Sequence, residues 1–326
     1  MRISLFRKWH AQGLIGEEAL RRAEIVEGRR VFSLYWELRL LLYLGVLLLT
    51  GGLGVLVYKN IDTIGHQAVL AFIALVTAAC FFYCSLRKAE FSWERVAAPD
   101  PFFDYVLLLG CLSLLIFLGY LQYEYGVFGD HYGLATFCPM VVLFLVAYFF
   151  DHLGALSLAI ANLAAWVGVA ITPLSILKSG NFANGRLILS GLLLAVALMG
   201  AGFLTLRRRW KAHFELTYTN FGFHLFFVAG LAGLFTFDRV YLLWFLGLMG
   251  CAWFMGVRAF ARGSMYFLVF IVLYCYVALS YFVIRVMEHV LLEAFSLLMF
   301  YFIGSATGVA LLLVFLNRKM KAHDRV

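Results

Sequence analysis

The stretch that decides the fold is Arg207-Arg208-Arg209-Trp210-Lys211, which places four cations within five residues. Apolar runs long enough to cross a bilayer flank it, at residues 187–206 and 217–235. A cluster of Lys and Arg between two spanning helices holds its loop on the cytoplasmic side of a membrane. The stretch therefore predicts the direction of both flanking spans and, through them, the direction of every other span.

The composition predicts that lipid surrounds most of the chain. Of its 326 residues, 64% are hydrophobic and 13% are charged, and the mean hydropathy is +0.92. Soluble domains have roughly 45–50% apolar and about 25% charged residues. We therefore predict an all-α fold, a polytopic integral membrane helix bundle whose main partner is the lipid bilayer. The net charge of +8 does not indicate nucleic acid, because the cations are spread over alternate loops.

Ten apolar runs follow residue 36, and we predict ten transmembrane helices within residues 37–317. A basic tail, residues 318–326, comes after them. The boundary between the fourth and fifth runs, at Asp151-His152, is the least distinct. Ten spans are compatible with two five-span halves of opposite orientation, a plan that some transporters use. The predicted spans are 38–58, 67–86, 103–123, 134–150, 153–172, 187–206, 217–235, 241–259, 265–287 and 291–316.

The distribution of cations supports an even number of spans. With ten spans and a cytoplasmic N-terminus, all but five of the 26 Lys and Arg residues lie on the cytoplasmic side. The five on the other side are Lys59, Lys178, Arg186, Arg239 and Arg285. Cytoplasmic loops carry an excess of Lys and Arg, so we expect a multi-pass protein of the bacterial inner membrane with both termini in the cytoplasm.

Residues 1–36 precede the first apolar run and are charged throughout, which does not match a cleavable signal peptide. Gly13 suits the end of one short helix, and Glu17-Glu18 suits the first turn of the next. We predict a cytoplasmic amphipathic helical hairpin. A DNA-binding helix-turn-helix is disfavoured because the segment is too small to bury a core of its own.

The same segment resembles a known family. Leu5, Trp9, the triplet Gly13-Leu14-Ile15 and Glu17-Glu18, followed by many apolar spans, are similar to the N-terminal signature of a family of bacterial predicted membrane proteins called domain of unknown function 2157. The resemblance covers roughly the first 30 residues, and beyond them only the multi-span character agrees. It implies a bacterial integral membrane protein without an assigned activity, and it carries over no functional residue.

Polar residues at membrane depth are the first candidates for function. Near the cytoplasmic side, four of them form a stripe with the spacing i, i+4, i+7 and i+11: His213, Thr217, Asn220 and His224. This spacing places them on one face of the helix that contains the seventh span. We expect that face to point toward the third or fifth span. Hydrogen bonding between spans and a cavity or proton-coupled site both remain open. Metal binding is disfavoured, because the two histidines of the stripe are three turns apart and no third ligand is suitably spaced. The candidate inner polar site is Asp104, Asp151, His152, His213, Thr217, Asn220 and His224.

A second polar group joins the ninth and tenth spans on the other side. If the helix continues through this connection, its members lie three or four residues apart and form a charged cap. A solvated rim and a gate or docking surface both remain open, since exposed ion pairs are common and weak. The candidate outer charged cap is Arg285, Glu288, His289 and Glu293.

Small residues spaced four apart predict close helix contacts. Gly191 and Ala195 have this spacing in the sixth span, and Gly304 and Gly308 have it in the tenth. Such pairs let helix backbones approach closely in lipid. The contacts lie either within the chain or in a homo-oligomer or a complex with a membrane partner.

Motifs of known chemistry do not point to an enzyme. The chain has no GxSxG, no HExxH and no phosphate-binding loop, and we predict neither a cofactor nor a metal. The leading hypothesis is a transporter-like carrier of a small molecule or lipid. The alternatives are a non-enzymatic membrane subunit or sensor that docks a protein partner, and an intramembrane lipid-modifying enzyme. A cavity among the spans would favour the carrier.

Overall fold

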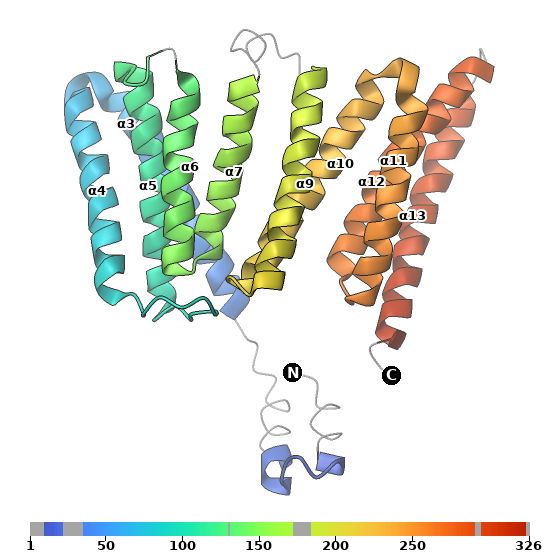
Figure 1. Cartoon of the computed structure of the whole chain (residues 1–326), viewed down its shortest axis with the longest axis horizontal. Coiled ribbons are helices and arrows are strands. Elements are labelled where there is room, and N and C mark those ends of the chain that lie inside the picture. The colour runs from blue at the N-terminus through green and yellow to red at the C-terminus, as the bar shows by residue number, and fades with distance from the viewer. Residues whose placement is uncertain (1–9, 22–34, 130, 172–183, 291–294, 324–326) are drawn as a thin grey trace. The chain divides into compact units, whose positions relative to one another are not determined.

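The computed structural model describes residues 10–21, 35–129, 131–171, 184–290 and 295–323. All regular elements in these residues are helices (Figure 1), which confirms the all-α prediction. Two short 3-10 turns, η1 (Ala212–Phe214) and η2 (Asp238–Val240), precede α10 and α11. The long helices are α3 (Tyr35–Ile64), α4 (His66–Arg87), α5 (Pro101–Tyr125), α6 (Tyr132–Phe150), α7 (Leu153–Ile171), α9 (Gly185–Arg208), α10 (Glu215–Thr236), α11 (Tyr241–Ala261), α12 (Met265–Val290) and α13 (Phe295–His323).

The chain is a polytopic helix bundle. Within the described residues, nine helices, α4 to α7 and α9 to α13, are long and apolar enough to cross a membrane. The predicted first span falls on α3, whose apolar part within the same residues is Leu40–Val55. Ten spans therefore remain a prediction, with α3 as the tenth candidate. The C-terminal helix α13 continues past the predicted span, which ends at residue 316, and includes Arg318 and Lys319.

Two compact units make up the chain, Met1–Phe72 and Ile73–Val326, with the boundary inside α4. The first unit contains α3 and short helical stretches at residues 10–11 and 17–21. Between these stretches, Gly13 has a φ of +73°, a left-handed conformation that glycine adopts without strain. The hairpin of residues 1–36 remains a prediction, since residues 1–9 and 22–34 lie outside the described part.

Within the second unit, the described helices α5, α6, α7 and α9 to α13 run alternately up and down (Figure 1). The connections α6–α7, α9–α10 and α11–α12 share one end. We call it the basic end, because Arg207, Arg208, Arg258 and Arg262 lie at or next to these connections. The charge asymmetry expected from the sequence therefore corresponds to two distinct ends of this unit.

Buried apolar residues form two clusters, and α10 contributes to both. The first cluster joins α4 to α7 and includes Leu107, Leu143 and Leu156. The second joins α10, α11, α12 and α13. On α10, Tyr218 belongs to the first cluster and Phe223 to the second. Helix α10 therefore packs against both groups of helices.

Glycines bring α9 and α10 into close contact. A Cβ added to Gly222 would lie 2.8 Å from the carbonyl oxygen of Ala195, and one added to Gly191 would lie 3.4 Å from the Cβ of Ala229. The predicted contact through Gly191 and Ala195 is confirmed, and α10 is the partner. Around Gly304 and Gly308 in α13, by contrast, no described atom lies within 4 Å of an added Cβ.

Candidate functional site

The connection between α6 and α7 is a two-residue turn, and it positions the first candidate residue. Asp151 follows the last residue of α6 with φ 57° and ψ 43°, the left-handed conformation common at helix C-termini. Asp tolerates this conformation better than most residues, because its short side chain can form local hydrogen bonds. The fourth and fifth spans therefore separate at Asp151-His152, where the sequence signal was weakest.

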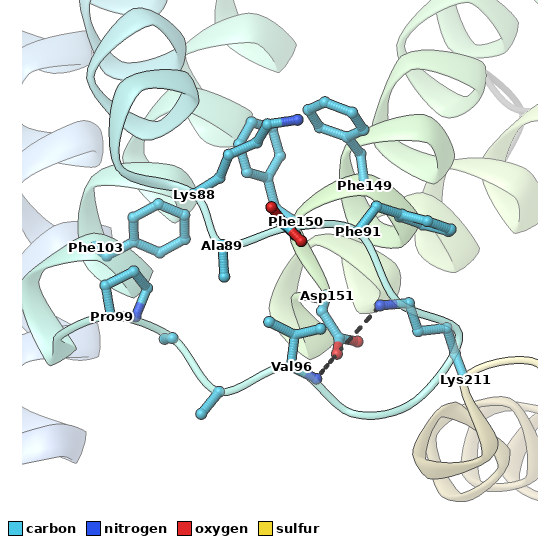
Figure 2. Close-up of a pocket in the computed structure, with 13 residues that line it drawn as sticks. Lys88, Ala89, Phe91, Val96, Pro99, Phe103, Phe149, Phe150, Asp151 and Lys211 are labelled. Carbon is cyan, nitrogen blue, oxygen red and sulfur yellow. Dashed lines mark hydrogen bonds and ion pairs between the residues drawn. The ribbon is translucent and has the colours of Figure 1, made fainter.

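The Asp151 carboxylate binds three groups that are distant in sequence. Its Oδ2 accepts a hydrogen bond of 2.6 Å from the backbone N–H of Val96 and lies 3.2 Å from Nζ of Lys211 (Figure 2). Its Oδ1 lies 2.5 Å from Nε2 of His213. The side chains of Asp151 and Lys211 are 2% and 1% exposed, so this ion pair is almost fully desolvated.

Lys211 is held in place by its backbone as well as by its charge. Its N–H donates to the carbonyl of Trp93 at 2.9 Å, and its Nζ lies 5.2 Å from the ring centroid of Phe91. Arg209 and Lys211 have φ angles of 56° and 49°, which are uncommon for residues other than glycine. Such strain persists where surrounding contacts over-determine the conformation, and here the buried pair supplies them.

These contacts tie three connections together at the basic end. The α4–α5 loop contributes Trp93 and Val96, the α6–α7 turn contributes Asp151, and the α9–α10 loop contributes Lys211 and His213. We call Asp151, Lys211 and His213 the clasp. The adjacent pocket has a volume of about 20 Å³, which is room for roughly one water. Both carboxylate oxygens are already engaged, so the geometry suits a structural connection better than substrate binding.

Two further members of the predicted inner site form a separate pair. His152 accepts a hydrogen bond of 3.0 Å at Nδ1 from the N–H of Ala155, which caps the start of α7. Its Nε2 lies 3.8 Å from Oδ1 of Asp104, and the two side chains are 5% and 19% exposed. The pair thus links the first turn of α5 to the start of α7.

His224 lies on another side of α10, and the expectation that it faces the third or fifth span is wrong. Its Nδ1 is 2.9 Å from the hydroxyl of Tyr274, and its Nε2 is 2.8 Å from the hydroxyl of Tyr266. Both tyrosines belong to α12, the predicted ninth span. The second apolar cluster, which joins α10 to α12, turns this face away from α5 and α7. The contacts agree with the interpretation of His224 as a hydrogen bond between spans.

The remaining members of the predicted stripe are not gathered into one site. Thr217 and Asn220 are partly buried on α10. The side-chain oxygen of Asn220 is buried and has no hydrogen-bond partner among the described residues. His213 contacts Asp151 in the α6–α7 turn, whereas His224 contacts Tyr274 on α12, so these contacts do not join the stripe into one site.

The predicted outer cap is described only in part. Arg285 donates to the hydroxyl of Tyr281 at 3.0 Å and forms an ion pair with Asp238 in the connection before α11. Glu288 and His289 belong to α12, but their side chains lie outside the described part, as does all of Glu293. The cap remains a prediction beyond Arg285.

Sequence reasoning missed a larger cavity among α9, α10, α11 and α12. Its volume is about 160 Å³. Apolar side chains from all four helices form most of its lining, and Glu215, Thr219, Arg258 and Arg262 supply the polar groups. The lining residues are Met199, Phe203, Leu206, Glu215, Thr219, Phe223, Phe254, Met255, Arg258, Ala259, Arg262 and Phe267.

Two of the residues that line this cavity, Arg262 and Glu215, form an ion pair at the basic end of the unit. Nη1 of Arg262 lies 2.9 Å from Oε1 of Glu215, and the Thr219 hydroxyl donates to the same oxygen at 3.4 Å. Glu215 is the first residue of α10, and Arg262 follows the last residue of α11. The sequence offered only a weak signal, an acidic residue at the start of an apolar run, and 47 residues separate the two partners.

These features define a polytopic helical membrane protein with polar contacts concentrated at one end and a cavity among four of its helices. A family model for predicted membrane proteins, domain of unknown function 2157, matches residues 7–156. The match confirms the resemblance found in the N-terminal residues and extends it to the start of α7. It takes in Asp104, Asp151 and His152, while Lys211 and the cavity lie beyond it. No curated protein and no solved structure matches the chain.

Proposed function

We propose that the protein is a carrier of a small amphipathic molecule or a lipid in the bacterial cytoplasmic membrane. The observation that supports this best is the cavity of about 160 Å³ among α9, α10, α11 and α12. Small-molecule sites are concave and mostly apolar, with a few polar groups that orient the ligand, and they occur between the helices of bundles. The cavity has this character, because phenylalanine and methionine make up half of its lining residues.

Charge supports an orientation for the carrier. The cavity lies next to Arg258 and Arg262, and the α9–α10 loop at the same end carries Arg207 and Arg208. We call the charged end of the cavity, formed by Glu215, Arg258 and Arg262, its mouth. Because cytoplasmic loops are rich in Lys and Arg, we place the basic end, and with it this mouth, in the cytoplasm. The carrier then takes up its ligand from the cytoplasm or from the adjoining leaflet.

The clasp supports a carrier over an enzyme. Asp151 and His213 are the pair that most resembles an acid–base couple, yet the carboxylate is occupied by Lys211 and Val96, and the neighbouring pocket holds about one water. In the cavity, the ionisable lining groups are one carboxylate and two guanidiniums. Guanidiniums orient anions but remain protonated, so they do not supply a general base. The carboxylate, Glu215, is engaged by Arg262 and Thr219.

Alternating access distinguishes a carrier from a fixed bundle. Thr219→Cys, in an otherwise cysteine-free full-length protein reconstituted into vesicles, places a thiol in the cavity. A carrier exposes this thiol in turn to both sides, so a small membrane-impermeant thiol reagent should modify it from either side. The matched control is Ala195→Cys at the buried α9–α10 contact, which should react from neither side. Reaction of Thr219→Cys from the basic end alone would contradict the proposal.

A membrane subunit is the second candidate, and α13 is the observation that favours it. Phe300 and Ile303 are 74% and 63% exposed, and Gly304 and Gly308 have no described neighbour within 4 Å of an added Cβ. Small residues four apart on an open helix provide a surface on which another spanning helix can pack. Cysteine cross-linking at Gly304 in native membranes tests this candidate, since a subunit should give one discrete cross-linked species.

A further inference from the structure

The charges at the mouth of the α9–α12 cavity do not cancel. Two guanidiniums, Arg258 and Arg262, and one carboxylate, Glu215, line it. The Arg262–Glu215 pair at 2.9 Å neutralises one cation. In the described part of the chain, no carboxylate lies within ion-pair distance of Arg258. Among the described residues, the mouth therefore carries one positive charge without a paired carboxylate.

Arg258 also lies beside exposed aromatic side chains. Its guanidinium carbon lies 5.5 Å from the ring centroid of Phe254, one turn earlier on α11. Phe254 is 56% exposed, and Phe203, on α9 across the cavity, is 54% exposed. A cation beside exposed aromatic rings is adjacent to the place where a lipid headgroup meets its acyl chains, so one ligand can contact both.

The size of the cavity limits what can enter it. A cavity of about 150 Å³ in another protein holds a molecule as small as benzene. The present cavity, at about 160 Å³, therefore encloses a short apolar segment and not a whole phospholipid. The remainder of a longer ligand would lie along the exposed apolar faces of α9 and α11, where Phe203 and Phe254 stand.

We propose that the cavity binds an anionic phospholipid of the adjoining leaflet, with its singly charged phosphate at Arg258 and the upper part of one acyl chain inside. This deepens the proposed function, on which it rests for the role of the cavity, by naming the class of substrate. The phosphate accepts charge-assisted hydrogen bonds from the planar guanidinium, which suits phosphate better than an ammonium does. Arg262 remains paired with Glu215 and fixes the mouth.

The test uses the full-length protein in detergent, titrated with dioctanoyl phosphatidylglycerol, with bound lipid counted by native mass spectrometry. Dioctanoyl phosphatidylcholine, which is net neutral, and inorganic phosphate are the comparison ligands. Both lipids present a singly charged phosphate to Arg258, but the choline ammonium of the neutral lipid brings a further cation to a site that already contains Arg258 and Arg262. We therefore expect the anionic lipid to bind about tenfold more tightly than the neutral lipid. Inorganic phosphate at the same concentration should not displace it.

Two variants assign the binding to the cavity. Arg258→Gln should weaken binding of the anionic lipid by about tenfold. Arg207→Gln removes the same charge from the same end but does not line the cavity, so it should weaken binding by no more than about fivefold, as expected for general surface attraction. Met255→Trp fills the cavity without changing charge and should also reduce binding. Thermal unfolding of each variant verifies that it is folded.

Three results would overturn the inference. Equal affinity for the two lipids would show that the site does not select a ligand of net negative charge. Displacement by inorganic phosphate would show a site for free anions. An equal effect of Arg207→Gln and Arg258→Gln would show surface attraction alone. If the lipid binds as expected while Thr219→Cys reacts from one side only, the carrier function fails and the lipid site stands.

Discussion

Asp151 and Lys211 form a buried ion pair with Oδ2 and Nζ 3.2 Å apart, and it joins the turn after α6 to the loop after α9. Lys211 belongs to the basic stretch whose other cations are exposed. The stretch therefore has two roles, since Arg207, Arg208 and Arg209 carry its charge to the surface while Lys211 holds the loop against the bundle. The clasp lies just before the start of α10, and α10 is one of the four helices that line the cavity.

Replacing Asp151 by Asn should destabilise the protein strongly. The variant leaves Lys211 buried without its counter-charge, and removal of one partner of a buried pair costs about 3–5 kcal/mol. Thermal unfolding in detergent should show a clear decrease in the midpoint. Arg207→Gln is the control, because it removes an exposed charge close by.

The double replacement Asp151→Leu with Lys211→Met separates charge from packing. Apolar residues of similar volume often replace a buried ion pair without loss. The double variant should therefore recover a large part of the stability lost in Asp151→Asn. No recovery would mean that the turn depends on the hydrogen bond to Val96, the contact with His213 or the tolerance of Asp for the left-handed conformation, and not on the ion pair.

Gly222→Ala should destabilise the α9–α10 contact. The new methyl group would lie 2.8 Å from the carbonyl oxygen of Ala195 and 3.1 Å from the backbone nitrogen of Met199, and backbone atoms cannot move aside cheaply. Overpacking of this kind costs about 1–3 kcal/mol. Gly200→Ala, on α9 with no described atom within 4 Å of the new methyl group, should be neutral or stabilising. Chemical unfolding in mixed micelles compares the two, and equal effects would contradict the assigned contact.

His224→Leu should reduce stability modestly and leave the fold intact. The change removes hydrogen bonds to Tyr266 and Tyr274, and hydrogen bonds between spans average about 0.6 kcal/mol with a maximum near 1.7 kcal/mol. We expect a total loss of about 1–2 kcal/mol. A double-mutant cycle with Tyr274→Phe measures the coupling directly. A coupling indistinguishable from zero would show that the histidine and the tyrosine do not bind each other in the membrane.

Thiol labelling tests which side of the membrane the basic end faces. In a cysteine-free background, Glu124→Cys and Arg239→Cys should react with an impermeant reagent on cells whose outer membrane has been opened. Arg208→Cys and Arg262→Cys should react only after the inner membrane is opened. All four positions are exposed. Lys211 is unsuitable, because its burial would block labelling from either side. The reverse pattern would invert the proposed topology.

Much of the fold could be predicted because its signals are local. The apolar runs predicted α4 to α7 and α9 to α13 within a few residues at most boundaries, since a bilayer demands a minimum length of apolar helix wherever the chain crosses it. Small residues in the sixth span predicted a close contact, because the distance between two packed helix backbones depends on side-chain size. The partner helix could not be predicted from size alone.

The candidate sites depended on residues that are far apart along the chain. Asp151 and His152 were singled out correctly as polar residues at a turn, but 62 residues separate Asp151 from His213, and 50 separate His224 from Tyr274. Periodicity identifies one face of a helix without identifying the helix that it faces. This is why His224 was expected to face the third or fifth span and instead contacts α12.

By itself, then, the sequence determined the helical membrane class, the approximate helix limits and the separation of charge between two ends, because each follows from the transfer of short segments from water to lipid. Only the tertiary structure decided that Lys211 is buried against Asp151 and that Glu215 meets Arg262 beside a cavity. Those contacts depend on how helices pack in three dimensions, and no local pattern of residue types specifies such packing.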